Sequence, residues 1–218
     1  MRGIFICYIG IDGSGKTSLV NEAMRLFRNQ GKEFQYVWGA HQLYLFEPAV
    51  RLGKRFVLGN KDSSKNYKAY LESVNSVGKN SFISACYRFA LLSEYFMQVY
   101  LKIGLPLWFG KNIISDRYLY DTLINMKINL GMQEEQLFRL MKKLSRYFPK
   151  PDRLYLVDVP EEIAFARKTD TPSIEYLKVR RPLYQKTAEY YDAGIIDGSV
   201  PKEAVVLQAM SFIKAIFN

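Results

Sequence analysis

The chain has 218 residues, of which 49% are hydrophobic and 24% are charged, so it is long enough for one domain with a sizeable core and too apolar for a disordered polyelectrolyte. Its formal net charge of +10 favours phosphorylated ligands, nucleic acid or acidic membranes as partners, although a solvated basic face would give the same number. Two cysteines, Cys7 and Cys86, exclude a disulfide framework. With His41 as the only histidine, a His-based triad and Cys/His zinc spacing are largely excluded.

Short apolar runs alternate with longer amphipathic segments along the whole chain. Up to residue 115, the patterns predict strands at 3–10, 34–38 and 112–115, with helices at 14–29 and within 79–103 between them. Two helices follow, one ending near 130 and one at 137–144, and then a strand at 153–159. The chain ends with a helix opening at 160, a helix at 173–191, a strand at 194–198 and a last helix from 201. Residues 41–66 show no clear period and are expected to be irregular. This alternation predicts one α/β domain with a parallel sheet covered by helices on both faces.

The N-terminal apolar run GIFICYIG stops at a glycine loop. It is too short for a signal peptide or a membrane span. Both cysteines lie in apolar surroundings and are interpreted as small core residues of a protein in a reducing compartment. A cytoplasmic location is therefore expected.

The stretch YIGIDGSGKTSLV carries a glycine, four residues and then Gly-Lys-Thr, the spacing of a phosphate-binding loop. An apolar strand before the motif and an amphipathic helix after it provide the context that such a loop requires. The loop amides and Lys16 are expected to hold the phosphates of ATP, and the Thr17 hydroxyl to hold Mg²⁺. The predicted ATP- and phosphate-binding residues are Gly10, Gly13, Ser14, Gly15, Lys16, Thr17 and Ser18.

Two acidic residues, Asp12 and Asp116, are expected to lie at the phosphate-binding loop. Asp12 lies inside the loop, where phosphates repel a carboxylate unless Mg²⁺ or a substrate hydroxyl engages it; a turn-stabilising hydrogen bond is the alternative. Asp116-Arg117-Tyr118 ends a predicted strand, where ligands of parallel sheets bind. Arg117 suits a bidentate grip on phosphate, and Asp116 suits a Mg²⁺-bound water or the orientation of Arg117. A helix-opening aspartate followed by an exposed arginine is the simpler alternative.

The motif GIDGSGKT and the Asp-Arg-Tyr sequence together resemble those of thymidylate kinases and related nucleoside monophosphate kinases. The resemblance covers about residues 4–213. It implies an α/β P-loop fold of the nucleoside monophosphate kinase type, with a five-stranded parallel sheet in three layers. It also implies a single domain over 1–218 with a short lid near 167–175. Many kinases of this family are dimers, so a homodimer is expected, with the long apolar helix around 82–101 as its contact.

The resemblance also implies roles for single side chains. Arg117 would contact the phosphate of the acceptor, Arg88 would contact its base, and Arg167 or Lys168 would close on the γ-phosphate. An amphipathic surface helix for Arg88 and a solvated helix end for the lid cations are the alternatives. The predicted acceptor-binding residues are Asp12, Arg88, Asp116, Arg117, Tyr118 and Asp121, and the predicted catalytic residues are Lys16, Arg117, Arg167 and Asp12. Mg²⁺ is assigned to Thr17 and Asp116, with Asp158 as a second carboxylate that would help.

Three departures from the family pattern fall on the acceptor side. The chain reads VWGAHQLYLFEP where the family carries Arg-Glu-Pro-Gly, and the lid segment is the short KTDTPS. Asp121 replaces the family's serine, and Asn125-Met126 replaces its Tyr-Gln. The basic segment 42–80 is compatible with an altered acceptor pocket, with a site for a larger phosphorylated partner, or with an exposed arm that binds nothing.

Residues and resemblance together predict a Mg²⁺- and ATP-dependent kinase that converts dTMP to dTDP. One alternative is a P-loop kinase of another phosphorylated or hydroxylated metabolite, in which Asp116 or Asp121 acts as a base. Another is a nucleotide-gated binding protein or ATPase. Small-molecule nucleotides are the expected partners, and neither a membrane nor nucleic acid is expected.

Overall fold

The computed structural model describes residues 2–42, 81–168, 170–201, 204, 205 and 208. Most of the segment expected to be irregular, nearly all of the basic segment 42–80 and most of the last expected helix lie outside this part of the chain. So does the Cys86 side chain. Among the described residues, no helix is long and apolar enough to cross a bilayer.

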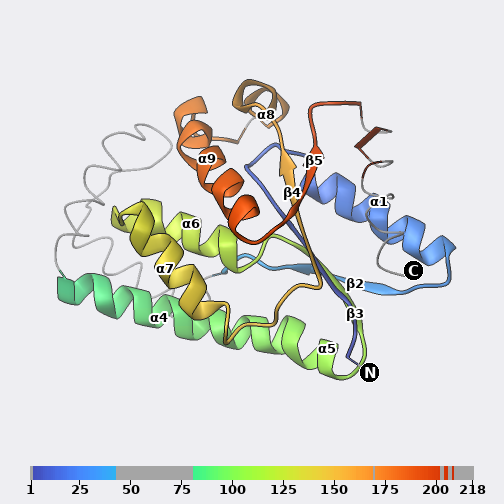
Figure 1. Cartoon of the computed structure of the whole chain (residues 1–218), viewed down its shortest axis with the longest axis horizontal. Helices are drawn as coiled ribbons and strands as arrows, with labels where there is room; N and C mark the ends of the chain where they lie inside the picture. The colour runs from blue at the N-terminus through green and yellow to red at the C-terminus, as the bar shows by residue number, and fades with distance from the viewer. Residues whose placement is uncertain (1, 43–80, 169, 202–203, 206–207, 209–218) are drawn as a thin grey trace.

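Five parallel strands form one sheet in the order β2-β3-β1-β4-β5 (Figure 1). The strands are β1 (Phe5–Ile9), β2 (Phe34–Trp38), β3 (Asn112–Asp116), β4 (Arg153–Asp158) and β5 (Gly194–Asp197). They coincide with the five predicted strands to within two residues at each end. The strand order reverses direction beside β1, so the carboxyl ends of β1 and β3 open onto the crevice where ligands of such sheets bind.

Alternate residues of each strand serve two separate cores. In β1, Phe5, Cys7 and Ile9 pack into the larger core, whereas Ile6 and Tyr8 pack into the smaller one, and all five are fully buried. Both faces of the strand are therefore covered, which explains why its sequence is a continuous apolar run rather than an alternating one.

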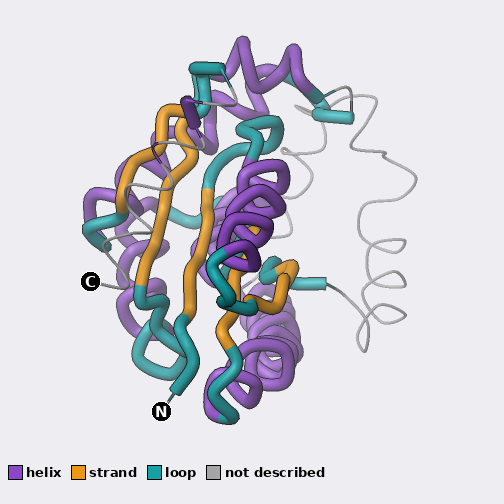
Figure 2. Tube along the Cα trace, turned by 90° about the vertical axis from the view of Figure 1, so that its right-hand side faces the viewer, coloured by secondary structure: helices purple, strands orange, loops and turns teal. Residues whose placement is uncertain are grey.

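Helices cover both faces of the sheet, and Figure 2 shows helices to either side of the strands. The smaller core lies under α1 (Lys16–Asn29), which buries Leu19, Val20, Ala23 and Phe27. The larger core lies under the helices of the other face. These are α4 (Ser81–Val99), α5 (Leu105–Trp108), α6 (Leu119–Leu130), α7 (Glu134–Leu144), α8 (Glu161–Arg167) and α9 (Ile174–Tyr190). The predicted three-layer α/β fold is confirmed.

The helix expected to end by residue 103 continues to Trp108 through the π-helical turn η1 (Tyr100–Gly104). The backbone N–H of Leu105 donates to the carbonyl of Tyr100, five residues back. Pro106 follows at once, and its ring would clash with a carbonyl four residues back in an ordinary helix. The wider π-helical turn accommodates the proline. The helix therefore continues through a Gly-Leu-Pro sequence that normally ends a helix.

Candidate active site

The phosphate loop runs from β1 to α1 and depends on glycines with left-handed backbone angles. Gly10, Gly13 and Gly15 have φ values of 145°, 81° and 90°. A Cβ atom on Gly13 would lie 2.1 Å from the carbonyl oxygen of Ala164 in α8. Glycine is required there for both reasons, and its lack of a side chain lets the loop pack directly against α8.

Lys16 opens α1 and folds back into the loop. Its Nζ donates to the carbonyl oxygens of Gly10 and Ile11 and to the hydroxyl of Ser14, at 2.9, 2.6 and 3.0 Å. The side chain is buried, and this burial, together with the positive charge of Arg117, lowers the pKa of Lys16 to about 7. The ammonium group therefore occupies a position that a phosphate anion would stabilise in its charged form.

Thr17 and Asp116 form the part of the site that fits a divalent cation. The Thr17 hydroxyl donates to Oδ2 of Asp116 at 2.5 Å, across the gap between α1 and β3. The other oxygen of this buried carboxylate, Oδ1, has no hydrogen-bond partner among the described residues. A hydroxyl and a carboxylate beside a phosphate loop are the oxygen ligands that Mg²⁺ uses together with water and phosphate. Among the described residues, no three or more His, Cys, Asp and Glu side chains are arranged so that they could hold a metal ion by themselves.

Asp158, the second predicted carboxylate, is engaged elsewhere. It accepts hydrogen bonds from Nε and Nη2 of Arg181 at 2.8 and 3.0 Å and from Gln185 at 3.0 Å. Arg181 also donates to Glu161 at 3.0 Å. This arrangement links α9 to β4 and α8, and it leaves Asp116 as the carboxylate in contact with Thr17.

Arg117 connects the phosphate loop to β3. Its guanidinium forms an ion pair with Asp12 through Nη2 and with Asp121 through Nη1, the latter at 3.2 Å. The residue has a φ of 71°, a left-handed conformation that costs energy for any residue other than glycine, and its N–H donates to the carbonyl of Tyr8. Such strain is typical of functional sites, because the surrounding contacts must hold the residue in place.

Asp12 is surrounded by positive charge. Burial alone would raise its pKa, but Arg117, Lys16 and Lys168, with a hydrogen bond from Tyr176, lower it to about 2. The Tyr176 hydroxyl donates to Oδ2 at 3.0 Å, and Nζ of Lys168 lies 3.6 Å from Oδ1. The loop carboxylate is thus a fixed anion held by side chains from the end of β3, from α9 and from the end of α8.

Asp121 is fully buried and has all its donors inside the protein. Its Oδ1 accepts from Arg117 and from the Tyr184 hydroxyl, the latter at 2.8 Å, and its Oδ2 accepts from the backbone N–H of Tyr118 at 2.9 Å. Burial raises its pKa. The carboxylate therefore caps α6 and orients Arg117, and no substrate can reach it directly.

One predicted acceptor residue, Tyr118, lies apart from the cluster formed by Asp12, Asp116, Arg117 and Asp121. The Tyr118 ring packs in the larger core, 5.1 Å from the ring of Phe5, and its hydroxyl donates to the carbonyl of Pro149. The structure therefore does not bring Tyr118 to Asp12, because an extended backbone at the start of α6 turns the side chain inward. Arg88 is half-buried on α4.

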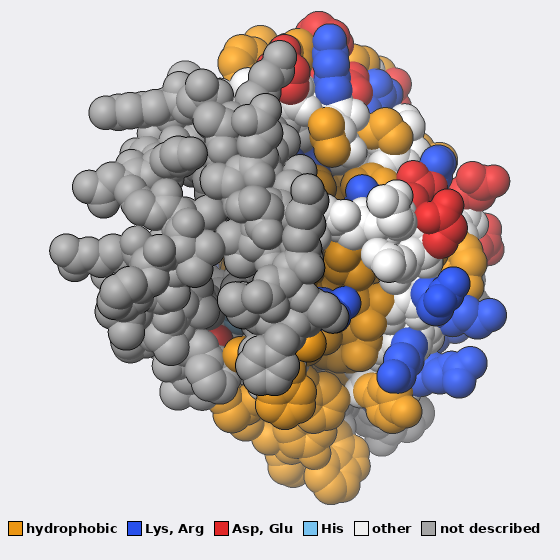
Figure 3. Space-filling model, turned by 90° about the vertical axis from the view of Figure 1, so that its left-hand side faces the viewer, with side chains coloured by type: hydrophobic (Ala, Val, Ile, Leu, Met, Phe, Trp, Pro, Cys, Tyr) orange, Lys and Arg blue, Asp and Glu red, His pale blue; other side chains and the backbone are white. Residues whose placement is uncertain are grey.

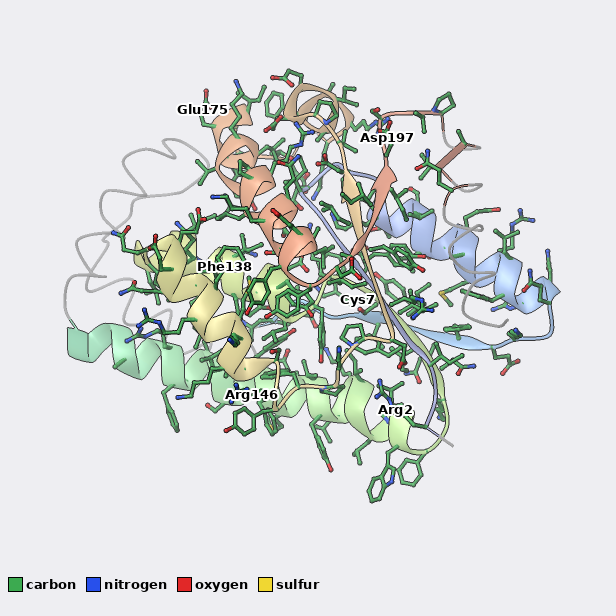
Figure 4. The ribbon with its side chains drawn as sticks, viewed as in Figure 1. Arg2, Cys7, Phe138, Arg146, Glu175 and Asp197 are labelled. Atoms are coloured by element: carbon green, nitrogen blue, oxygen red, sulfur yellow. The ribbon has the colours of Figure 1, made fainter. Side chains whose placement is uncertain are left out.

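The two basic residues of the predicted lid segment have different partners. Nη1 of Arg167 donates to the carbonyl of Gly198 at 2.8 Å, whereas Lys168 faces Asp12. A cavity beside the start of α1 is lined by Ser14, Gly15, Ser18, Leu19, Arg167, Gly198, Val200 and Val205. Figure 4 shows Glu175, near the start of α9, and Asp197, at the end of β5, along the same edge of the molecule.

The site also contains residues that the sequence did not reveal as partners of Asp12 and Asp121. Tyr176 and Tyr184 come from α9, more than sixty positions further along the chain. The guanidinium of Arg180 lies over the Tyr176 ring, 3.4 Å from its centroid, and is within 3.4 Å of the Asn125 amide oxygen. Pairing of a tyrosine with a distant carboxylate leaves no local pattern, so only the packing of α9 identifies these residues.

The sheet order, the glycine loop that opens α1 and the arginine at the end of β3 are those of an α/β P-loop kinase fold. No protein-family model matches the chain. A probable thymidylate kinase 1 of Saccharolobus solfataricus is 28% identical over 210 residues, covering 94% of each chain. A probable thymidylate kinase of Pyrococcus abyssi is 27% identical over 228 residues, covering 99% of this chain and 93% of the relative.

The thymidylate kinase of Leptospira interrogans is 25% identical over 216 residues, which cover 96% of this chain and 93% of the relative. These similarities extend over nearly the whole chain. The resemblance that the motifs predict is therefore confirmed, and it supports an assignment to the thymidylate kinase family.

Proposed function

We propose that this protein transfers the γ-phosphoryl group of ATP to the phosphate of a nucleoside monophosphate, with dTMP as the first expected acceptor. The observation that carries the proposal is the ion pair between Asp12 of the phosphate loop and Arg117 at the end of β3. It joins a site for the donor's phosphates to a side chain suited to grip a second phosphate. The curated relatives, which are named thymidylate kinases, support the same activity.

The chemistry assigned to the chain is positioning together with charge neutralisation. Lys16 and the loop amides hold the phosphates of ATP, while Asp12 and Arg117 orient the acceptor in line with the γ-phosphate. Mg²⁺ would be held by Thr17 and Asp116, and when bound it neutralises charge on the donor's phosphates. The orphaned oxygen of Asp116 supports this assignment.

A phosphate acceptor is favoured over a hydroxyl acceptor because none of the three carboxylates of the cluster is a suitable general base. Asp121 is buried with all its donors internal, and the pKa of Asp12 is about 2, which makes its carboxylate a very weak base. Oδ2 of Asp116 accepts from Thr17, and its carboxylate would be occupied by Mg²⁺ in this proposal. An acceptor phosphate is already an anionic nucleophile and needs no base. The alternative of a kinase for hydroxylated metabolites is correspondingly weaker.

We assign the lid cation of the reaction to Lys168 in preference to Arg167. The 3.6 Å separation of Lys168 from Asp12 supports a position near the transferring phosphate. The bond from Arg167 to Gly198, beside the cavity at the start of α1, supports a role in holding the donor nucleotide. Positive charge near the migrating phosphoryl group is the largest aid that a protein can give to this reaction.

The activity is tested by coupled measurement of ADP release with dTMP, dUMP, other nucleoside monophosphates and no acceptor. We expect release that depends on a nucleoside monophosphate and is fastest with dTMP, and a Lys16→Met variant serves as the inactive control. Rapid release without acceptor, unchanged by any monophosphate, would instead indicate an ATPase or nucleotide-gated protein. Release with non-nucleotide acceptors alone would refute the nucleotide assignment.

We also propose that two copies pair through the exposed apolar face of α4 and η1. This face consists of Phe89, Phe96, Met97, Tyr100 and Leu101, and Phe89 and Leu101 are 76% and 56% exposed. Figure 3 shows hydrophobic side chains gathered along this lower edge of the molecule. An apolar stripe along α4 and η1, interrupted by the exposed Ser93, suits a two-fold, self-complementary contact. Light scattering should give a dimer mass that Phe96→Glu reduces to the monomer's, and a wild-type monomer would refute the pairing.

A further inference from the structure

The acceptor side of the site contains two aromatic side chains to which no role has been given. Tyr36 and Trp38 lie on the same face of β2, and each is 37% exposed. Trp38 is paired in register with Asp116, and its ring centroid lies 5.4 Å from Cζ of Arg117. An aromatic ring with open surface therefore stands directly beside the arginine assigned to the acceptor phosphate.

The other aromatic rings of this cluster have no comparable open face. The ring of Tyr176 is covered by the guanidinium of Arg180. Four more rings are buried, with at most 4% of each residue exposed: Tyr95, Tyr118, Tyr120 and Tyr184. An incoming base can stack only on a ring that solvent reaches. Phe34, at the start of β2, is half-buried and stacked on Phe27. Among the other described residues of β2, and those of β3, α6 and the part of α9 at the site, Trp38 and its neighbour Tyr36 are the rings that meet this requirement.

We propose that Trp38 is the stacking platform for the heterocyclic ring of the acceptor, while Arg117 holds the phosphate of the same molecule. The inference rests on the proposed function and adds the side chain that recognises the base. Indole presents the largest π-face of any side chain, and stacking accepts every planar base. The platform therefore selects nucleotides over sugar phosphates that lack a base, and leaves the choice among bases to other contacts.

Tryptophan fluorescence tests this assignment without catalysis, because the chain contains two tryptophans, Trp38 and Trp108. Trp108 is 73% exposed and lies at the opposite end of the sheet, where Gly3 donates to the carbonyl of Leu107. Figure 4 shows Arg2 at that end, away from Glu175 and Asp197. A Trp108→Phe variant thus keeps the site intact and leaves Trp38 as the sole reporter.

In this background, dTMP and other nucleoside monophosphates should quench Trp38, and 2-deoxyribose 5-phosphate, which has no base, should not. Absence of quenching with every nucleoside monophosphate would overturn the proposal. Wild-type protein that fails to phosphorylate dTMP would instead refute dTMP as the acceptor. The fluorescence titration with the remaining monophosphates would still decide the role of Trp38.

Kinetics separate a stacking platform from a residue that only positions Arg117. Trp38→Leu should raise the KM for the acceptor by roughly 10-fold or more and leave the KM for ATP unchanged, and Trp38→Phe should restore most of the loss. Inhibition by 2-deoxyribose 5-phosphate should be the same in wild type and Trp38→Leu. If this inhibition weakens as much as dTMP binding does, Trp38 acts through Arg117 and the platform is refuted. If the leucine variant does not fold, the fluorescence titration of the Trp108→Phe variant decides between the two roles.

Discussion

The buried carboxylate of Asp121 is the point at which the fold and the acceptor site depend most strongly on each other. Three donors converge on its two oxygens: Arg117 and Tyr184 on Oδ1, and the Tyr118 N–H on Oδ2. In Asp121→Asn the amide NH₂ must face at least one of these donors, and the negative charge beside Arg117 is lost. The variant should therefore be destabilised even though its shape is almost unchanged.

The size of the effect follows from these contacts. One unsatisfied buried group costs about 1–3 kcal/mol, and breaking a buried ion pair costs about 3–5 kcal/mol when the partner loses its only counter-charge. Arg117 keeps its pair with Asp12, so the lower part of this range applies. We expect a loss of about 3 kcal/mol. In a chain of this length that lowers Tm by roughly 6–12 °C.

Urea denaturation and thermal melting followed by circular dichroism measure this loss. Asp152→Asn is the matched control, because Asp152 forms an exposed ion pair with Arg2 and its bond from the Phe5 N–H can be kept by an amide oxygen. The control should lose less than about 1 kcal/mol. An Asp121→Asn variant as stable as the control would show that the buried cluster does not hold the fold together in this way.

Three further predictions concern the donor side. Binding of phosphate at Lys16 should return the pKa of this lysine from about 7 toward its ordinary value, so ATP binding should take up a proton. The affinity for ATP should therefore fall by about tenfold per pH unit between roughly pH 7 and 10. Calorimetry in buffers of different ionisation enthalpy measures the proton uptake, and no proton uptake at pH 8.5 would contradict the prediction. Gly13→Ala should abolish ATP binding, because the new Cβ clashes with α8. Gly31 has a similar φ and open space around the position of an added Cβ, so Gly31→Ala should cost only about 1–2 kcal/mol of stability. Equal ATP affinity in the two variants would count against the clash. Lys168→Met should lower kcat by about 100-fold and leave the KM for ATP nearly unchanged. Arg167→Met should raise the KM for ATP and leave kcat nearly unchanged. The opposite pattern in steady-state kinetics would show that the two residues have each other's roles.

The sequence predicted the three central strands of the sheet well because β1, β3 and β4 are largely buried on both faces. A continuous apolar run such as GIFICYIG has few other ways to fold when it is followed by a glycine loop. The loop and the position of Arg117 at a strand end followed from residue spacing within short segments. The structure then brings these segments together through the register of β1 with β3, in which Tyr8 pairs with Asp116.

The residues that sequence reasoning missed or misdirected depend on long-range packing. Tyr176 and Tyr184 contact Asp12 and Asp121 only because of the way in which α9 packs against the rest of the fold. The same packing brings Arg181 into contact with Asp158. The inward direction of Tyr118 is set by the backbone at the start of α6. No local pattern encodes such geometry.

Transfer of radiolabel from [γ-³²P]ATP to dTMP tests the central claim most directly, because it follows the phosphoryl group itself. With Mg²⁺ and dTMP present, we expect label to appear in dTDP as fast as ADP forms, and we expect Lys16→Met to show neither product. Label released only as inorganic phosphate, at a rate that dTMP does not change, would contradict the proposed transfer.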